Sequence, residues 1–291
     1  MPFALQSLAK VFVYGLALED HGREHVLEHV GVEPSGDAFN SIDFDERQQR
    51  PHNPMVNAGA LVTADLVRGA NIEEKLERVL ATLRVYAGND GLSVDARIFE
   101  LEMRSADRNR AIAYLMRSQQ MLAGDVEAIL GLYLRQCSVM VTCRDLAVMA
   151  ATLANGGVNP LTGRRALRHS LVRDVLSVMH TCGMYDAAGQ WAYDIGVPAK
   201  SGVSGGILAV IPEKLGIGVF SPRARRLRQQ RARGAGVPRC LRAPRPPHLR
   251  RRGRGCAAGR RWRRCIRLID VTSVSPRPTP PLRTLSGRSR K

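Results

Sequence analysis

Hydrophobic residues in the first 220 positions recur mostly at the spacing of α-helices. Apolar positions three and four residues apart, together with one continuous apolar stretch near the start, predict a series of helices. The predicted helices cover residues 8–18, 57–62, 72–85, 108–118, 126–136, 144–155 and 170–180. Gly22, Gly156 and Gly183 follow three of them, as glycine often does at a helix end. Residues 31–57 contain repeated Pro and Gly turn signals and predict a loop.

The spacing of apolar residues changes after position 199. Segments 206–211 and 216–220 are short and rich in branched apolar residues, and they flank a turn-forming segment at 212–215. This arrangement predicts two antiparallel strands, and a further strand is expected at Lys200. Many helices followed by a late antiparallel sheet indicate an α+β fold. The sequence shows no transmembrane stretch, no signal peptide and no internal repeat.

Charge is distributed very unevenly along the chain. The formal net charge is +18, but residues 223–291 hold 22 arginines and one lysine against a single acid, Asp270. Residues 1–222 therefore carry a small negative charge, as an ordinary globular domain does. We expect a folded domain at 1–222 and a disordered Arg/Pro/Gly-rich tail at 223–291. An alternative is a tail that binds nucleic acid electrostatically, although Trp262 is its one aromatic residue.

The cysteines do not suggest a metal site. Cys137, Cys143 and Cys182 lie within the folded region and are expected to be free, buried thiols. Three further cysteines lie in the tail, without a Cys-x-x-Cys pair or a histidine at zinc-finger spacing. We therefore expect no bound metal.

Ser7-Leu8-Ala9-Lys10 is the first candidate for chemistry. If Ser7 begins a helix, Lys10 lies one turn later on the same face, within reach of the serine hydroxyl. A serine needs a neighbouring base to act as a nucleophile at neutral pH, and lysine can supply one. The amide of Ser7 then points outward from a positive helix end, where an oxyanion is favoured. The four-residue motif alone is not specific.

Longer strings extend along the chain in a fixed order and are far more specific. They are residues 32–36 (VEPSG), 51–60 (PHNPMVNAGA), 107–109 (DRN), 149–157 (MAATLANGG), 182–186 (CGMYD) and 199–206 (AKSGVSGG). On these strings, from about Phe3 to Pro222, the chain resembles the serine-dependent glutaminases, a family with a β-lactamase-like fold. The resemblance implies a helical subdomain around 55–180 and an antiparallel sheet.

The resemblance also implies a reaction and a set of site residues. The reaction is hydrolysis of L-glutamine to L-glutamate and ammonia, without a metal or an organic cofactor. Ser7 corresponds to the acylated nucleophile, Lys10 to its proton-transfer partner, Tyr185 to a second proton-handling group, and Tyr133 to a group that assists ammonia departure or deacylation. The amides of Ser7 and Val203 correspond to the oxyanion hole. The substrate-binding set is Gln6, Asn57, Glu102, Asn109, Tyr133, Tyr185 and Val203.

Six of these residues have an alternative structural interpretation. Tyr133 and Tyr185 have the character of amphipathic core residues. Glu102 lies near Glu100 and suits a solvated helix face. The remaining alternatives are helix capping for Asn57 and Asn109, and a surface position for Lys10.

The chain departs from the family pattern at both ends. Family members carry several dozen residues before the nucleophile, and after Pro222 the sequence changes abruptly in composition. We expect from this that the sheet is reduced to the 206–220 hairpin and that the chain is poorly stable and weakly active or inactive. A shifted reading frame is the corresponding hypothesis for the tail.

Two further expectations concern enzyme class and assembly. Lys200-Ser201-Gly202 also resembles a strand motif of penicillin-binding proteins and β-lactamases, but no Ser-Asp-Asn motif occurs. The glutaminase resemblance implies a homodimer or homotetramer. It also implies a cytoplasmic location, which agrees with free thiols.

Overall fold

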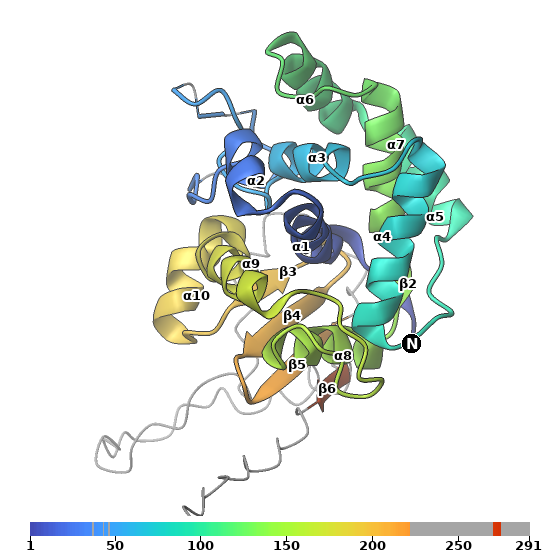
Figure 1. Ribbon diagram of the computed structural model, residues 1–291, viewed down its shortest axis with the longest axis vertical. Helices are drawn as coiled ribbons and strands as arrows, with labels where there is room; N and C mark the ends of the chain where they lie inside the picture. Colours follow the sequence, from blue (N-terminus) through green and yellow to red (C-terminus); the bar gives the residue numbers. More distant parts are fainter. Residues whose placement is uncertain (37, 43, 46, 222–269, 275–291) are drawn as a thin grey trace, which may run out of the picture.

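The structure is a computed structural model that describes residues 1–221 and 270–274, apart from residues 37, 43 and 46. Its helical part forms most of the molecule (Figure 1). The α-helices are α1 (Ala9–His21), α2 (Arg23–His29), α3 (Asn57–Asp65), α4 (Ile72–Ala87), α5 (Ala96–Arg104), α6 (Asp107–Ser118), α7 (Val126–Cys137), α8 (Cys143–Ala154), α9 (His169–Cys182) and α10 (Ala188–Asp194). Two short 3₁₀ turns, η1 (Gln6–Leu8) and η2 (Tyr185–Ala187), precede α1 and α10.

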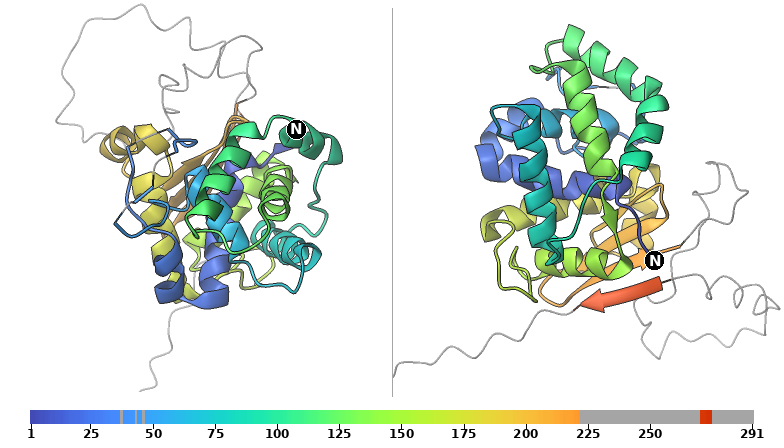
Figure 2. Two further views of the ribbon diagram at one scale, coloured as in Figure 1. Left: turned by 90° about the horizontal axis from the view of Figure 1, so that it is seen from above. Right: turned by 90° about the vertical axis from the view of Figure 1, so that its right-hand side faces the viewer.

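The strands form two antiparallel sheets. The larger sheet has the order β3 (Ala199–Ser201), β4 (Gly206–Ile211), β5 (Leu215–Phe220) and β6 (Asp270–Val274). In the second sheet, β1 (Phe3–Ala4) pairs with β2 (Met140–Val141). Strand β6 is the last strand of the larger sheet, beside β5, and α8 packs against β4, β5 and β6 (Figure 2). The first residues of the chain therefore lie between the helical part and the sheet.

Helix α1 is the central helix of the core. Every residue from Ala9 to Leu18 is buried, and the helix contacts α2, α3, α4 and α9. A helix that is apolar on all faces is stable only when other elements surround it, which explains the long apolar run at 8–18. Phe12 packs against Tyr86 of α4, with ring centroids 4.8 Å apart. This burial fixes the position of the turn that precedes α1.

Local signals fix the ends of several helices. Asn71 accepts a hydrogen bond from the Glu74 amide at the start of α4. Thr142 and Asp145 form a reciprocal capping box at the start of α8. Such caps satisfy backbone N–H groups that have no partner within the helix, and each contributes about 1 kcal/mol.

Small residues let α8 lie directly on strand β5. A Cβ atom at Gly216 would overlap the backbone of Ala151, and one at Gly218 would overlap that of Cys143. Glycine within a strand commonly marks such a close backbone approach. The alternation of glycine and larger residues in β5 therefore holds the sheet against the helical part.

Most of the predicted elements are confirmed. The seven predicted helices correspond to α1, α3, α4, α6, α7, α8 and α9, and β4 and β5 form the predicted hairpin. Cys137, Cys143 and Cys182 are buried, and none of them forms a disulfide with another described cysteine. The expectation that the sheet is only the 206–220 hairpin is wrong, because β3 and β6 pair with its two edges. The predicted tail at 223–291 lies outside the described residues except for β6.

No described helix is long and apolar enough to cross a membrane.

Candidate active site

Ser7 lies in η1, at the junction of the helical part and the sheet. This turn contacts α7, β3 and β4 as well as α1. Ser7 is 6% exposed, and the preceding residue, Gln6, has a positive φ of 52°. Positive φ is unfavourable for a residue with a side chain, and such strain is concentrated at functional sites. Ser7 therefore lies in a 3₁₀ turn directly before α1 and is not the first residue of the α-helix.

Lys10 is buried in the first turn of α1. It is 0% exposed, and its Nζ donates hydrogen bonds to the Asn57 side-chain oxygen at 2.7 Å and to the Met55 carbonyl at 3.0 Å. Burial lowers the pKa of Lys10 to about 7, although the nearby Cys137 opposes this shift. A lysine with this pKa can accept a proton at neutral pH. Among the described residues no Ser7–Lys10 hydrogen bond is formed.

Asn57, the first residue of α3, is the centre of a polar network. Its Oδ1 accepts hydrogen bonds from Lys10 and, at 3.3 Å, from the Tyr133 hydroxyl of α7. Its Nδ2 donates to Oδ1 of Asn109, in α6, at 2.7 Å. Burial, Cys137 and Tyr185 raise the pKa of Tyr133 well above its ordinary value, so this hydroxyl keeps its proton. The network thus joins the proton acceptor to groups that can bind a polar substrate.

Gln6 and Glu102 meet at the more exposed side of the site. The Gln6 Nε2 donates to Glu102 Oε1 at 2.9 Å, and both residues are partly exposed. Glu102 is supplied by α5, whose start is capped by the Asp95 side chain. A carboxylate here can attract the amino group of a substrate.

Tyr185 lies close to Ser7, Lys10 and Lys200. Its hydroxyl is buried and has no hydrogen-bond partner of standard geometry among the described residues. Burial raises the pKa of Tyr185, and the neighbouring Ser7 hydroxyl partly offsets that rise. Lys10 Nζ lies 5.6 Å and Lys200 Nζ 3.6 Å from the centre of the Tyr185 ring. Tyr185 also has a positive φ, of 56°. The buried Tyr185 hydroxyl thus lies beside the Ser7 hydroxyl, on a residue whose backbone is strained.

Lys200, in β3, is a member of this site that the sequence-based set of site residues does not include. It is 0% exposed and donates to the Ser201 carbonyl at 2.7 Å. Burial, followed by repulsion from Lys10, lowers the pKa of Lys200 well below its usual value. The Lys-Ser-Gly motif in the sequence was the signal for it. Two buried amines near one serine make a site with unusual proton chemistry.

A close approach of α9 to β3 brings these groups together. Gly183 ends α9, and a Cβ at this position would overlap the Ala199 carbonyl oxygen. The Ser201 amide donates to the Gly183 carbonyl at 3.3 Å. Any larger residue at 183 would separate Tyr185 from the strand that carries Lys200.

Val203 lies in the turn between β3 and β4. Its amide donates to no backbone carbonyl of the described residues, and Val203 is 41% exposed. Gly202 packs this turn against η1, because a Cβ there would lie 3.2 Å from the Leu8 side chain. The turn is thus held beside Ser7 with a backbone donor available.

The structural alternatives for several residues are wrong. Lys10 is not on the surface, and neither Asn57 nor Asn109 caps a helix. Tyr133 is a core residue, yet its hydroxyl belongs to the polar network. Glu102 is not fully solvated, since it accepts from Gln6. The predicted site residues thus lie around η1, and the turn between β3 and β4 places Val203 beside them.

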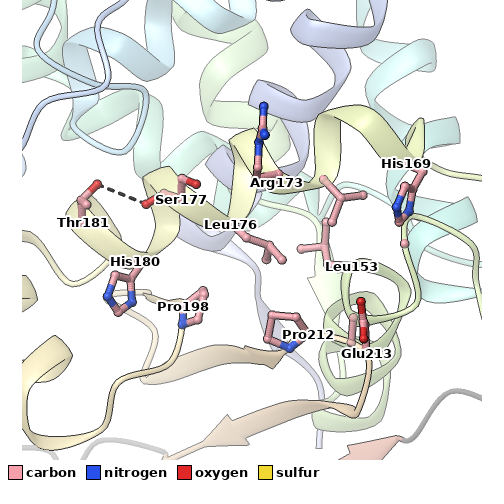
Figure 3. A pocket seen from close by; sticks show the side chains of 13 residues that line it. Leu153, His169, Arg173, Leu176, Ser177, His180, Thr181, Pro198, Pro212 and Glu213 are labelled. Carbon is pink, nitrogen blue, oxygen red and sulfur yellow. Dashed lines mark hydrogen bonds between the residues drawn. The ribbon is translucent and has the colours of Figure 1, made fainter.

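A second hollow lies elsewhere in the molecule. A cavity of about 550 Å³ is formed mainly by α9, the end of α8 and the β4–β5 turn. Leu176 and His180 of α9 point toward Pro198 and Pro212 across it (Figure 3). None of the predicted site residues lines this cavity, so it is separate from the site at Ser7.

Comparison with protein families gives one match, to the family model described as Glutaminase, over residues 1–232. The match thus continues past the predicted domain boundary at 222. A glutaminase of Trichormus variabilis is 58% identical over 220 residues, which are 76% of this chain and 66% of that protein. Glutaminase 2 of Bradyrhizobium diazoefficiens is 51% identical over 76% of this chain and 35% of its own length. The chain spans just under two thirds of the first of these relatives.

Solved structures agree with the family match. A probable glutaminase of Bacillus subtilis has a TM-score of 0.70 at 39% identity, covering 73% of this chain and 68% of that one. A structure described as Mglu in its glutamate form has a TM-score of 0.73 at 47% identity, covering 77% and 51%. These similarities show the expected β-lactamase-like fold and favour neither alternative function. The chain belongs to the glutaminase family.

Proposed function

We propose that this chain hydrolyses the side-chain amide of L-glutamine to L-glutamate and ammonia through an acyl-enzyme on Ser7. The observation that carries the proposal is the environment of Lys10. It is fully buried one turn after Ser7, its pKa is lowered to about 7, and Asn57 holds its amine. The family membership of the chain adds the substrate class.

In the first step, the Ser7 oxygen attacks the amide carbon of the substrate. The new C–O bond forms as the serine proton passes to Lys10, and Tyr185, which stands near both, is placed to relay it. The carbonyl oxygen becomes an oxyanion, for which the amides of Ser7 and Val203 are the proposed donors. Two preorganised backbone donors of this kind commonly contribute several kcal/mol to lowering a barrier.

In the second step, the C–N bond breaks and ammonia leaves. The nitrogen takes the proton that Lys10 received, and Tyr133 assists through its hydrogen bond to Asn57. Water then attacks the acyl carbon and gives one proton to Lys10. The ester bond to the Ser7 oxygen breaks as that proton returns to Ser7, and glutamate is released. No metal or organic cofactor takes part in this proposal.

Polar side chains at the more exposed side of the site bind the amino and carboxylate groups of the substrate. Glu102 accepts from the substrate's ammonium group, and the amides of Asn57, Asn109 and Gln6 bind its carboxylate and amino groups. Amide side chains both donate and accept hydrogen bonds, which suits a zwitterion.

Lys200 is a positioning residue in this proposal. Its amine lies over the Tyr185 ring at 3.6 Å, and its neighbour Lys10 disfavours a second positive charge. We infer that Lys200 fixes the orientation of the Tyr185 side chain, while burial, and after it Lys10, lower the pKa of Lys200.

Assembly, location and domain limits belong to the same proposal. We propose a homodimer or homotetramer, a cytoplasmic location and a catalytic domain at 1–222 followed by a basic tail, of which residues 270–274 pair with the sheet as β6. The support is the resemblance to the glutaminases and the three free thiols. Light scattering of the purified chain tests the assembly, since a monomer would contradict it.

The direct test measures glutamate and ammonia released from L-glutamine by the purified chain and by a Ser7→Ala variant. Equal amounts of both products from the unaltered chain, and none from the variant, support the proposal. Release that persists in Ser7→Ala would overturn the acyl-enzyme, and no release from either protein would overturn the activity itself.

A further inference from the structure

Three potential metal ligands lie on one turn of the short helix α2. His25 and Glu28 are three residues apart, and His25 and His29 are four apart, so the side chains share one helix face. One ligand atom from each of the three residues lies within 4.8 Å of the others. Nδ1 of His25 is 3.7 Å from Oε2 of Glu28. The active site described above uses none of these residues.

The hydrogen bond made by His29 favours metal binding. Its Nδ1 lies 2.9 Å from the carbonyl oxygen of His25, and since a carbonyl only accepts, Nδ1 carries the proton. In the neutral ring Nε2 then has a free lone pair. Histidines that bind metals commonly donate their other nitrogen to a backbone carbonyl in this way.

His21 supports the cluster without joining it. Its Nε2 lies 2.7 Å from the carbonyl oxygen of Leu66 and is therefore already paired. Its ring stacks on His25 with centroids 4.8 Å apart, and His25 in turn lies 4.6 Å from His29. These ring contacts restrict the orientation of His25 and so reduce the ordering that a metal must impose.

The distances fit a small transition-metal ion. Ligand bonds of about 2.0 to 2.1 Å place neighbouring ligand atoms about 3.4 Å apart around a tetrahedral ion such as Zn²⁺ and about 2.9 Å apart at right angles around Ni²⁺. The 3.7 Å between His25 and Glu28 needs only a small adjustment, which the Glu28 side chain, 71% exposed, is free to make. We propose that His25, Glu28 and His29 bind one divalent ion that prefers imidazole ligands, such as Zn²⁺ or Ni²⁺, with solvent completing its coordination.

This site is separate from the proposed hydrolytic centre. Helix α1, with 13 residues, spans roughly 20 Å between the Ser7 end and α2. Figure 1 shows α2 beside α1 and α3, at the end of α1 away from the larger sheet. The ion therefore binds outside the reaction and ties together the turn of a helix that is only 7 residues long. Isolated helices of this length are marginal, so binding should stabilise the folded chain.

Calorimetric titration of Ni²⁺ into the untagged full-length chain tests the proposal. Nickel suits imidazole ligands and is less drawn to thiolates than zinc is. A His25→Ala/His29→Ala double variant should bind one equivalent fewer, or bind that equivalent at least tenfold more weakly. The matched control is His169→Ala, an exposed histidine at the start of α9, which should bind as the unaltered chain does. Unchanged stoichiometry and affinity in the double variant would overturn the site.

A second variant keeps the test decisive if the double variant does not fold. Glu28→Gln changes a side chain that is 71% exposed and removes one ligand charge. We expect this variant to fold and to bind Ni²⁺ several-fold more weakly, with a smaller metal-dependent rise in unfolding temperature. An affinity equal to that of the unaltered chain would contradict the three-ligand site.

Discussion

The two ends of the α1–α2 segment hold polar side chains under opposite conditions. At one end Ser7 and Lys10 are 6% and 0% exposed, while at the other the side chains of His25 and Glu28 are 44% and 71% exposed. Both pairs consist of polar residues three apart in the sequence. Burial lowers the pKa of Lys10 to about 7. The exposed pair lies on the surface of α2, where the rings of His21 and His29 contact His25. In the proposed mechanism this spacing supports proton transfer at the buried end, because the fold excludes water there.

Removing the nucleophile should have the largest effect at the buried end. We expect Ser7→Ala to lower kcat for glutamine hydrolysis by a factor on the order of 10⁴ or more, because the acyl-enzyme cannot form. Release of ammonia measures the loss. Ser177→Ala, at an exposed position of α9, should keep the activity of the unaltered chain. Similar losses in both variants would show a general effect on folding and contradict the assignment.

Removing the buried amine should have the next largest effect. Lys10→Met keeps a similar volume but cannot accept a proton, so we expect kcat to fall by about 10²- to 10⁴-fold. The matched control is Lys214→Met, in the exposed β4–β5 turn. Activity that survives in Lys10→Met would mean that another residue is the proton acceptor. It would contradict the role that burial gives to Lys10 at this end of the segment.

Removing the charge of Glu102 should affect substrate binding more than the chemical steps. In Glu102→Gln the substrate's ammonium group loses its charged partner, so we expect KM to rise about 10- to 100-fold with a smaller change in kcat. Steady-state kinetics separate the two parameters. Glu100→Gln, an exposed position on the same helix, should leave both unchanged. A lower kcat without a change in KM would remove Glu102 from substrate binding.

The smallest effect should be on the pH dependence of stability. Lys200 has a lowered pKa in the folded chain, so the unfolded chain binds more protons between that pKa and 10.5. The unfolding free energy therefore rises with pH across this range. Lys200→Met should reduce the rise by up to about 1.4 kcal/mol per pH unit. Denaturant unfolding at a series of pH values measures it, and an identical rise in both proteins would mean that Lys200 is not buried as described.

Periodicity predicted the helices well because their apolar faces are regular. The helices that it did not predict, α2, α5 and α10, are short, with 7, 9 and 7 residues. The predicted start of the first helix, at Leu8, lies one residue before that of α1, and Ser7 belongs to a 3₁₀ turn that contacts the sheet. Such tertiary contacts leave no periodic signal in the sequence.

The site was predicted largely through long motifs rather than through spacing. Asn57, Glu102 and Tyr133 are far apart in the chain, and only the fold reveals that Asn57 links Lys10 to Tyr133. Lys200 was visible as part of a motif, but its role depends on its contact with Tyr185. The expected sheet was too small, because the pairing of β6 with β5 could not be deduced from local patterns.

The pH dependence of kcat/KM for L-glutamine tests the central claim most directly. If burial makes Lys10 the proton acceptor of Ser7, kcat/KM should rise with pH, pass its midpoint at about 7 and then level off as Lys10 loses its proton. A profile that is flat across neutral pH, or that falls as pH rises through 7, would contradict the account.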